Sequence, residues 1–194
     1  HDNLPIWEGV EGVQCKVIDL PLDYLLFRLA NRRTWDAQKY ASSTKYTFEL
    51  PDGATSVEAS EEIFDPKNQG EQDSQDHQYE LLVVEAMKIS GRVGDLNLMQ
   101  ILEQEGWKPK DRPVITPDGV LVNGNCRVAA IEYLIQEGIS IPGINSADPF
   151  IQVKVTPTNP TGDQSIDELE RALQHGDRGR LDYDWIQTTS DMKR

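Results

Sequence analysis

The chain has 194 residues, of which 38% are hydrophobic, so it is long enough to form one domain around an apolar core. Its 33 acidic and 19 basic residues give a formal net charge of −14, which argues against a generally basic surface for duplex DNA. The sequence contains no run of 18 apolar residues and no signal-like start, and its two cysteines form no disulfide framework. We therefore expect a cytoplasmic protein that does not enter the membrane.

The first fifty residues combine short apolar segments with polar turns. We expect residues 1–13 to form a loosely held N-terminal tail. The apolar residues that follow predict a strand over 13–20 and a helix over 21–30. A polar turn is expected at 31–36, and alternating apolar and polar residues predict a second strand over 46–50.

Residues 51–75 stand out as an acidic insertion. Ten acidic residues occur between Glu49 and Glu80, and the only basic residue among them is Lys67. Because apolar residues are scarce there, we expect a long loop over 52–76. Such a charged segment is either a solvated loop or a surface that meets a basic partner protein or mimics DNA.

Two amphipathic helices are predicted after the acidic insertion. The spacing of apolar residues indicates one helix over 76–90 and another over 96–105. We expect Asp95 to cap the start of the second helix and Gly106 to end it. The apolar face of the first helix is formed by Tyr79, Leu82, Val83, Ala86 and Met87.

The second half of the chain alternates strands and helices. Short apolar runs predict strands over 113–116 and 120–123, a helix over 126–136 and a strand over 150–155. A helical extension is expected over 161–194. The order of these elements predicts an α+β fold with a small mixed sheet and flanking helices.

The junction between the second of these strands and its helix has the pattern Gly-x-x-Arg. It presents Gly124, Asn125, Cys126 and Arg127 at a helix N-terminus, where backbone N–H groups lack helical partners and the helix dipole favours an anion. Gly124 permits close approach of the backbone, and Arg127 supplies a positively charged fork. The turn is therefore a candidate phosphate-binding site, although the local pattern is equally typical of an ordinary strand-to-helix turn.

These segments, in their order along the chain, resemble the ParB/sulfiredoxin superfamily. The strand, Gly-x-x-Arg turn and Ala-containing helix over 117–134 resemble its central motif, and Asn31-Arg32-Arg33 resembles its Asn-x-Arg box. The resemblance implies a ParB/sulfiredoxin-like domain over 14–160 that contains the acidic insertion. It is closest to the stand-alone ParB-like nuclease and NTPase domains of mobile elements.

The resemblance also implies a function. Related domains bind or hydrolyse nucleotides, so we expect ATP or CTP with Mg²⁺ as the ligand. NTP hydrolysis and phosphoryl transfer are the two activities that the resemblance allows. The setting implied is plasmid or phage DNA maintenance, conjugation control or defence, with DNA as a further partner. Glu80 and Arg127 are the catalytic candidates. The residues expected to contact the nucleotide are Asn31, Arg33, Gly124, Asn125, Cys126 and Arg127.

Departures from the family pattern leave other functions open. Cys126 stands where partition proteins have the first of two arginines, and the reactive cysteine of sulfiredoxins aligns with Asn125. A non-catalytic regulatory module that contacts proteins through its acidic surface is the main alternative. A metal-dependent DNA nuclease and thiol chemistry at Cys126 are two others. Asn31 either contacts the ligand or caps the segment that follows it.

One cluster of acidic residues and histidine is a further candidate. Asp73, Asp76, His77 and Glu80 are spaced so that some share a helix face. Such a group either holds a hard divalent ion, supplies a general base, or forms the capped and solvated start of a helix. Of the four, we retain Glu80 as a site residue, because the family packs this helix near the Gly-x-x-Arg turn.

Overall fold

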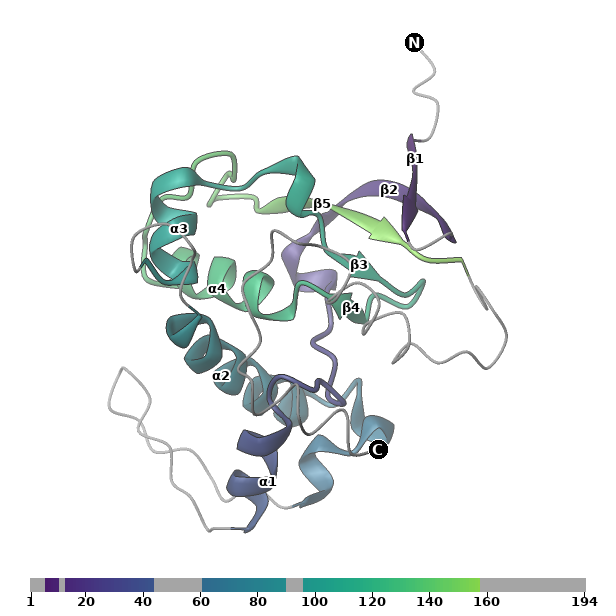
Figure 1. The fold of residues 1–194 in the computed structure, drawn as a ribbon, viewed down its shortest axis with the longest axis vertical. Coiled ribbons are helices and arrows are strands. Elements are labelled where there is room, and N and C mark those ends of the chain that lie inside the picture. Colours follow the sequence, from purple (N-terminus) through teal and green to yellow (C-terminus); the bar gives the residue numbers. More distant parts are fainter. Residues whose placement is uncertain (1–5, 11–12, 44–60, 90–95, 158–194) are drawn as a thin grey trace.

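A computed structural model describes residues 6–10, 13–43, 61–89 and 96–157 of the chain. This part is α+β: a small mixed sheet lies beside a layer of helices (Figure 1). The sheet has five strands in the order β1-β2-β5-β3-β4. The strands are β1 (Ile6–Val10), β2 (Val13–Pro21), β3 (Val114–Ile115), β4 (Leu121–Asn123) and β5 (Phe150–Val155). Neighbouring strands are antiparallel except β3 and β5, which are parallel.

The helices are α1 (Trp35–Ser43), α2 (Gln72–Lys88), α3 (Leu98–Glu105) and α4 (Asn125–Gln136). Among the described helices, none is long and apolar enough to cross a bilayer. Four short 3-10 helices complete the described structure: η1 (Leu22–Tyr24), η2 (Glu61–Phe64), η3 (Pro66–Asn68) and η4 (Pro109–Asp111).

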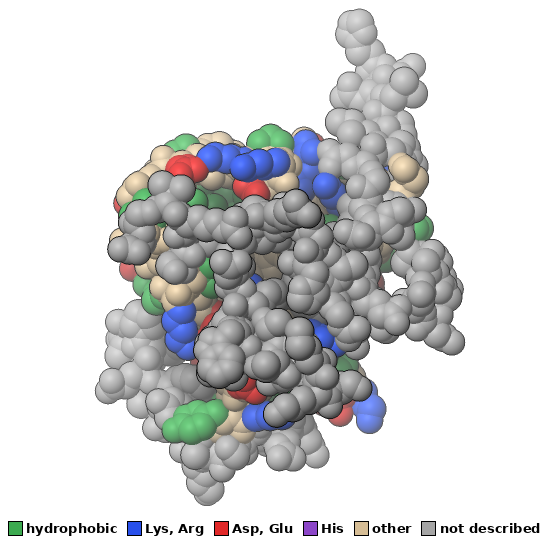
Figure 2. All heavy atoms as spheres, in the orientation of Figure 1, with side chains coloured by type: hydrophobic (Ala, Val, Ile, Leu, Met, Phe, Trp, Pro, Cys, Tyr) green, Lys and Arg blue, Asp and Glu red, His purple; other side chains and the backbone are tan. Residues whose placement is uncertain are grey.

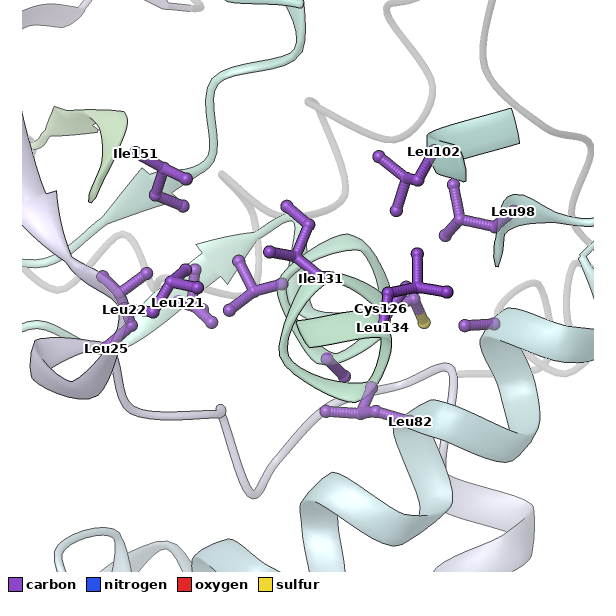
Figure 3. Packing of buried hydrophobic residues seen from close by; sticks show 14 of the residues in the cluster. Leu22, Leu25, Leu82, Leu98, Leu102, Leu121, Cys126, Ile131, Leu134 and Ile151 are labelled. Atoms are coloured by element: carbon purple, nitrogen blue, oxygen red, sulfur yellow. The ribbon is translucent and has the colours of Figure 1, made fainter. Parts of the chain in front are cut away.

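Helix α4 forms the centre of the hydrophobic core. Seen end-on in Figure 3, it lies between Leu121 and Ile151 of the sheet on one side and Leu82, Leu98 and Leu102 of α2 and α3 on the other. A helix that is apolar around most of its circumference is buried on most sides. Accordingly, the residues of α4 from 128 to 131 are fully buried.

The strands and helices predicted over residues 96–155 are confirmed. The helix predicted over 126–136 begins one residue earlier, and the strand predicted over 150–155 is β5. The helix predicted over 96–105 is α3, but its cap is Asn97. The side chain of Asn97 accepts a hydrogen bond from the backbone N–H of Gln100 (2.9 Å), and the Gln100 side chain accepts one from Asn97 (2.9 Å). The capping box explains why the helix begins after Asn97.

The prediction of a loosely held tail over 1–13 is wrong for residues 6–10. These residues form β1, an edge strand that pairs antiparallel with β2, with Trp7 opposite Lys16. The strand over 13–20 is confirmed as β2, which extends to Pro21. β1 was missed because a five-residue strand with a glycine near its end has a weak apolar alternation.

The helix expected over 21–30 was also wrong. Only η1 is helical, and Leu26 then forms a parallel bridge with Val120. In the stretch that follows η1, Leu25, Phe27, Arg28 and Leu29 are buried and Leu26 is partly buried. The apolar run was long enough for a helix, but the stretch is buried on more than one side and takes its hydrogen bonds from other parts of the chain.

Side-chain amides supply the hydrogen bonds of this extended stretch. Gln75 accepts from the backbone N–H of Phe27 (2.7 Å) and donates to the Phe27 carbonyl (3.0 Å). Gln78 donates to the carbonyl of Arg28 (3.0 Å), and Gln38 donates to that of Leu29 (2.6 Å). Glutamines of α1 and α2 therefore satisfy backbone groups that a neighbouring strand satisfies elsewhere.

The long loop expected over 52–76 was wrong at its C-terminal end. Within the described residues it contains η2 and η3, and α2 begins at Gln72. Phe64 packs with Ala41 and Leu81 in a small second cluster, which fastens this part of the acidic segment. The start of α2 was missed because its buried face includes Ser74 and glutamines rather than apolar residues.

Helix α1 was not predicted; a polar turn was expected over 31–36. The turn is present but ends at Thr34, and α1 follows from Trp35. The strand predicted over 46–50 and the helical extension over 161–194 lie outside the described residues.

Candidate functional site

The Gly-x-x-Arg turn joins β4 to α4 as predicted. Gly124 is the N-cap of α4 and has a left-handed backbone (φ 93°, ψ 7°). A Cβ at this position would lie 3.0 Å from the Cβ of Pro113, so glycine is required both by φ and by packing. Glycine has no side chain to cap the helix, so α4 begins without a side-chain hydrogen bond at its N-cap.

Asn125 is a structural residue of the turn. It is only 5% exposed. Its side-chain oxygen accepts from the backbone N–H of Arg28 (2.9 Å), and its side-chain nitrogen donates to the carbonyl of Leu121 (3.1 Å). Both ends of the amide are therefore used to join the turn to the extended stretch that follows η1.

Cys126 belongs to the hydrophobic core (Figure 3). Burial raises the pKa of its thiol to about 11, and this effect outweighs the opposing influence of the positive charges of Arg33 and Arg127. Reactive cysteines have lowered pKa values. Thiol chemistry at Cys126 requires a shift in the opposite direction, so this alternative is not supported.

Arg127 joins α4 to η4. One guanidinium nitrogen donates to the backbone carbonyl of Asp111 (2.9 Å), and another lies 3.7 Å from the Asp111 carboxylate. η4 also carries Lys110, and it is flanked by Lys108 and Arg112. Figure 2 shows Lys and Arg side chains along the upper edge of the molecule, where η4 links α3 to the sheet.

The Asn-Arg-Arg box forms a turn before α1. Asn31 is buried, and its side-chain oxygen accepts from the backbone N–H of Arg33 (2.9 Å). Asn31 thus caps the segment that follows it, which was one of its two predicted roles. Arg33 is close enough to the start of α4 for its charge to lower the pKa of the Cys126 thiol, so the structure brings Arg33 and Arg127 to the same end of α4.

Glu80 lies elsewhere, in a cavity of about 760 Å³ between α2, the C-terminal half of α4 and residues 22–27. Among the described residues that line this cavity, none comes from the Gly-x-x-Arg turn. Of the two catalytic candidates, Glu80 lines this cavity and Arg127 does not. Farther along α2, Glu85 is near enough to the start of α4 for its charge to raise the pKa of the Cys126 thiol.

The cavity is acidic. Its described lining contains no Lys, Arg or His. One carboxylate oxygen of Glu80 is fully buried and has no hydrogen-bond partner. Burial raises the pKa of Glu80, and it raises the pKa of Glu132 to about 8. The acidic residues that line the cavity are Asp23, Asp76, Glu80, Glu132 and Glu137.

The cluster of acidic residues and His77 forms the polar start of α2. A ring nitrogen of His77 donates to the carbonyl of Asp73 (2.7 Å), and Asp76 accepts from the side chain of Gln72 (2.7 Å). Across residues 6–10, 13–43, 61–89 and 96–157, no three His, Cys, Asp or Glu side chains are grouped so as to hold a metal ion. Of the cluster, Asp76 and Glu80 are among the residues that line the cavity.

Glu132 was not among the residues predicted from the sequence. An acidic residue within the apolar helix sequence that surrounds it is the signal that was available. It is informative because carboxylates are rarely buried without a compensating partner.

The chain was compared with known proteins. No protein-family model, no curated protein and no solved structure matches it.

Proposed function

We propose that this chain binds the phosphate groups of a nucleotide at the N-terminus of α4. The ligand is ATP or CTP with Mg²⁺, as the resemblance to the ParB/sulfiredoxin superfamily implies. One observation carries the proposal: positive side chains gather around a helix start that has no side-chain cap. Gly124 provides the uncapped start, and Arg33 and Arg127 are near enough for their charges to lower the pKa of the Cys126 thiol, against the single opposing charge of Glu85.

The distribution of charge along α4 supports an anion at this end. Acidic residues near a helix N-terminus and basic residues near its C-terminus are stabilising. α4 has neither: its first turn contains Arg127, and the residue at its C-cap is Glu137. A bound phosphate supplies the negative charge that the first turn lacks, and it is attracted by the N–H groups and the arginines together.

Nucleotide binding is proposed for this site, and nucleotide hydrolysis is not part of the proposal. Glu80, the acidic residue that was expected to act with Arg127, lines a separate cavity. A role in plasmid or phage DNA maintenance, conjugation control or defence remains the setting implied by the resemblance. DNA as a partner also stays a prediction, since the net charge of −14 disfavours a long polyanion.

The test is calorimetric titration of ATP, CTP and GTP with Mg²⁺ into the wild type, Arg33→Ala, Arg127→Ala and Lys67→Ala. We expect one nucleotide to bind and each arginine variant to weaken it by about tenfold or more, the loss of a charge-assisted contact. Lys67→Ala removes the same charge from an exposed position on η3 and should bind like the wild type. Because Arg127 also holds Asp111, thermal melting must show that its variant is folded.

Two results would overturn the proposal. One is that none of the three nucleotides binds the folded wild type. The other is that a nucleotide binds and that folded Arg33→Ala and Arg127→Ala both retain the wild-type affinity.

A further inference from the structure

The cavity that Glu80 lines is a candidate site that the proposed function does not use. It is formed by residues of η1 and the stretch after it, one face of α2, and the C-terminal half of α4. Its volume of about 760 Å³ is within the range of cavities that hold small organic ligands. It lies toward the opposite end of α4 from the Gly-x-x-Arg turn, about 15 Å along the helix axis from Cys126 to Gln136.

Charge decides which ligands the cavity can accept. Five acidic residues line it, and the described lining includes no basic side chain. Glu80 is half-buried, and one of its carboxylate oxygens is buried without a hydrogen-bond partner. A carboxyl group in such surroundings is favoured in its ionised form by a positive charge nearby. An anion is therefore repelled from this cavity, and a ligand that donates hydrogen bonds from a positive group is favoured.

The remaining walls are apolar and aromatic. Leu25 and Val83 contribute buried aliphatic surface. Phe27 and Tyr79 lie with their ring centroids 5.9 Å apart, and Tyr133 is a third aromatic residue of the lining. Aromatic faces attract organic cations, and the attraction is strongest where the cation is removed from water.

We propose that this cavity binds a small organic cation: an amine or guanidinium group attached to an apolar body. The positive group lies against Glu80 and Glu132, and the apolar body lies against the aromatic and aliphatic wall. The C-terminal end of α4 adds the negative end of the helix dipole, which favours a cation there. The inference goes beyond nucleotide binding, because it assigns a second ligand of opposite charge to a separate site.

The first test is a titration with three indole probes of similar size that differ in charge. Tryptamine is a cation at pH 7, 3-methylindole is neutral and indole-3-acetate is an anion. We expect tryptamine to bind most tightly and indole-3-acetate not to bind. We also expect Glu80→Gln and Glu132→Gln each to weaken tryptamine by about tenfold, the loss of one charged contact.

Asp73→Asn is the matched control. It removes one carboxylate from the exposed first turn of α2, outside the described lining of the cavity. It should bind tryptamine like the wild type. If all three acidic variants weaken tryptamine equally, the effect is one of net charge and the proposal is overturned.

A second readout is proton release. With a pKa of about 8, Glu132 is largely protonated at pH 7, and a cation beside it favours the ionised form. Tryptamine binding should therefore release protons, seen as a dependence of the binding enthalpy on the ionisation enthalpy of the buffer. The release should be smaller in Glu132→Gln. The other titratable groups lining the cavity are Asp23 from η1, Asp76, Tyr79 and Glu80 from α2, and Tyr133 and Glu137 at the end of α4.

Three outcomes would overturn the inference. The first is that tryptamine does not bind at millimolar concentration. The second is that the neutral or anionic probe binds as tightly as tryptamine. The third is that a lysine-rich peptide binds the wild type but not Glu80→Gln, while tryptamine neither binds nor competes with the peptide. That result would make the cavity a protein-contact site.

Discussion

The side-chain oxygen of Asn125 accepts a hydrogen bond from the backbone N–H of Arg28 at 2.9 Å, across 97 residues of sequence. This contact fastens the extended stretch after η1 to the Gly-x-x-Arg turn. The same stretch lines the acidic cavity with Phe27. One buried amide therefore connects the candidate anion site at the start of α4 with one wall of the candidate cation site.

Replacing this amide should destabilise the fold. Asn125→Ala leaves a buried N–H of Arg28 and a carbonyl of Leu121 without their side-chain partner. We expect a loss of about 1–3 kcal/mol in the free energy of unfolding. Asn145→Ala, which removes an exposed side-chain contact to Ala147, should change it by less than about 0.5 kcal/mol. Urea unfolding monitored by circular dichroism measures both, and equal effects would contradict a structural role for Asn125.

Gly124→Ala tests the backbone of the turn. The positive φ of 93° and the approach of Pro113 to 3.0 Å both oppose a Cβ. We expect a destabilisation of about 1–3 kcal/mol. Gly70→Ala is the control, because a Cβ there meets nothing within 4 Å, and it should change stability by less than about 0.5 kcal/mol. A Gly124→Ala variant as stable as Gly70→Ala would show that the turn relaxes readily.

Glu132 should make stability depend on pH. Burial, with a smaller contribution from Asp23, raises its pKa from 4.5 to about 8. The folded state thus holds this proton more tightly than the unfolded state. The stabilisation is fully present below pH 4.5, declines as the unfolded chain ionises, and is lost as pH rises through about 8.

The variant Glu132→Gln keeps the neutral amide at every pH. Relative to the wild type, it should gain stability between pH 5 and pH 8, by on the order of 2–4 kcal/mol. Glu103→Gln changes an exposed carboxyl on α3 and should not alter the slope. Urea unfolding at several pH values gives both curves. A wild-type curve parallel to that of Glu132→Gln would contradict a raised pKa at Glu132.

Cys126 should be unreactive in the folded protein. Its pKa of about 11 leaves little thiolate at pH 8. We expect iodoacetamide to modify it about a hundredfold more slowly in native buffer than in urea. Mass spectrometry of digested samples distinguishes Cys126 from Cys15, which is also buried. Rapid native modification confined to Cys126 would revive the thiol chemistry that its position in the core argues against.

The elements around the turn were predictable from sequence because each has one clear periodicity. β4, α4 and β5 are apolar and are bounded by Gly124, Gly138 or Pro149, so their types and limits were close to those observed. The stretch over 21–30 failed for a physical reason. Its hydrogen-bond partners are glutamine side chains from α1 and α2, and no local pattern reveals partners that are remote in sequence.

The candidate site was predictable only in part. The Gly-x-x-Arg turn depends on residues next to one another, so its form followed from the sequence. The position of Glu80 depends on which residues of α2 face which end of α4, and that is a matter of tertiary packing. Tyr79 donates to Gln136 at the far end of α4 (3.0 Å), and its neighbour Glu80 lines the same cavity as these two residues.

The central claim is that a nucleotide phosphate binds at the N-terminus of α4. The most direct measurement is a residue-resolved NMR titration of the ¹⁵N-labelled chain with the Mg²⁺ complexes of ATP and CTP, compared with tryptamine. We predict that one nucleotide shifts the amide signals of residues 124–127, whereas tryptamine shifts those around Glu80 and Glu132. The account would be contradicted if neither nucleotide moves the signals of residues 124–127.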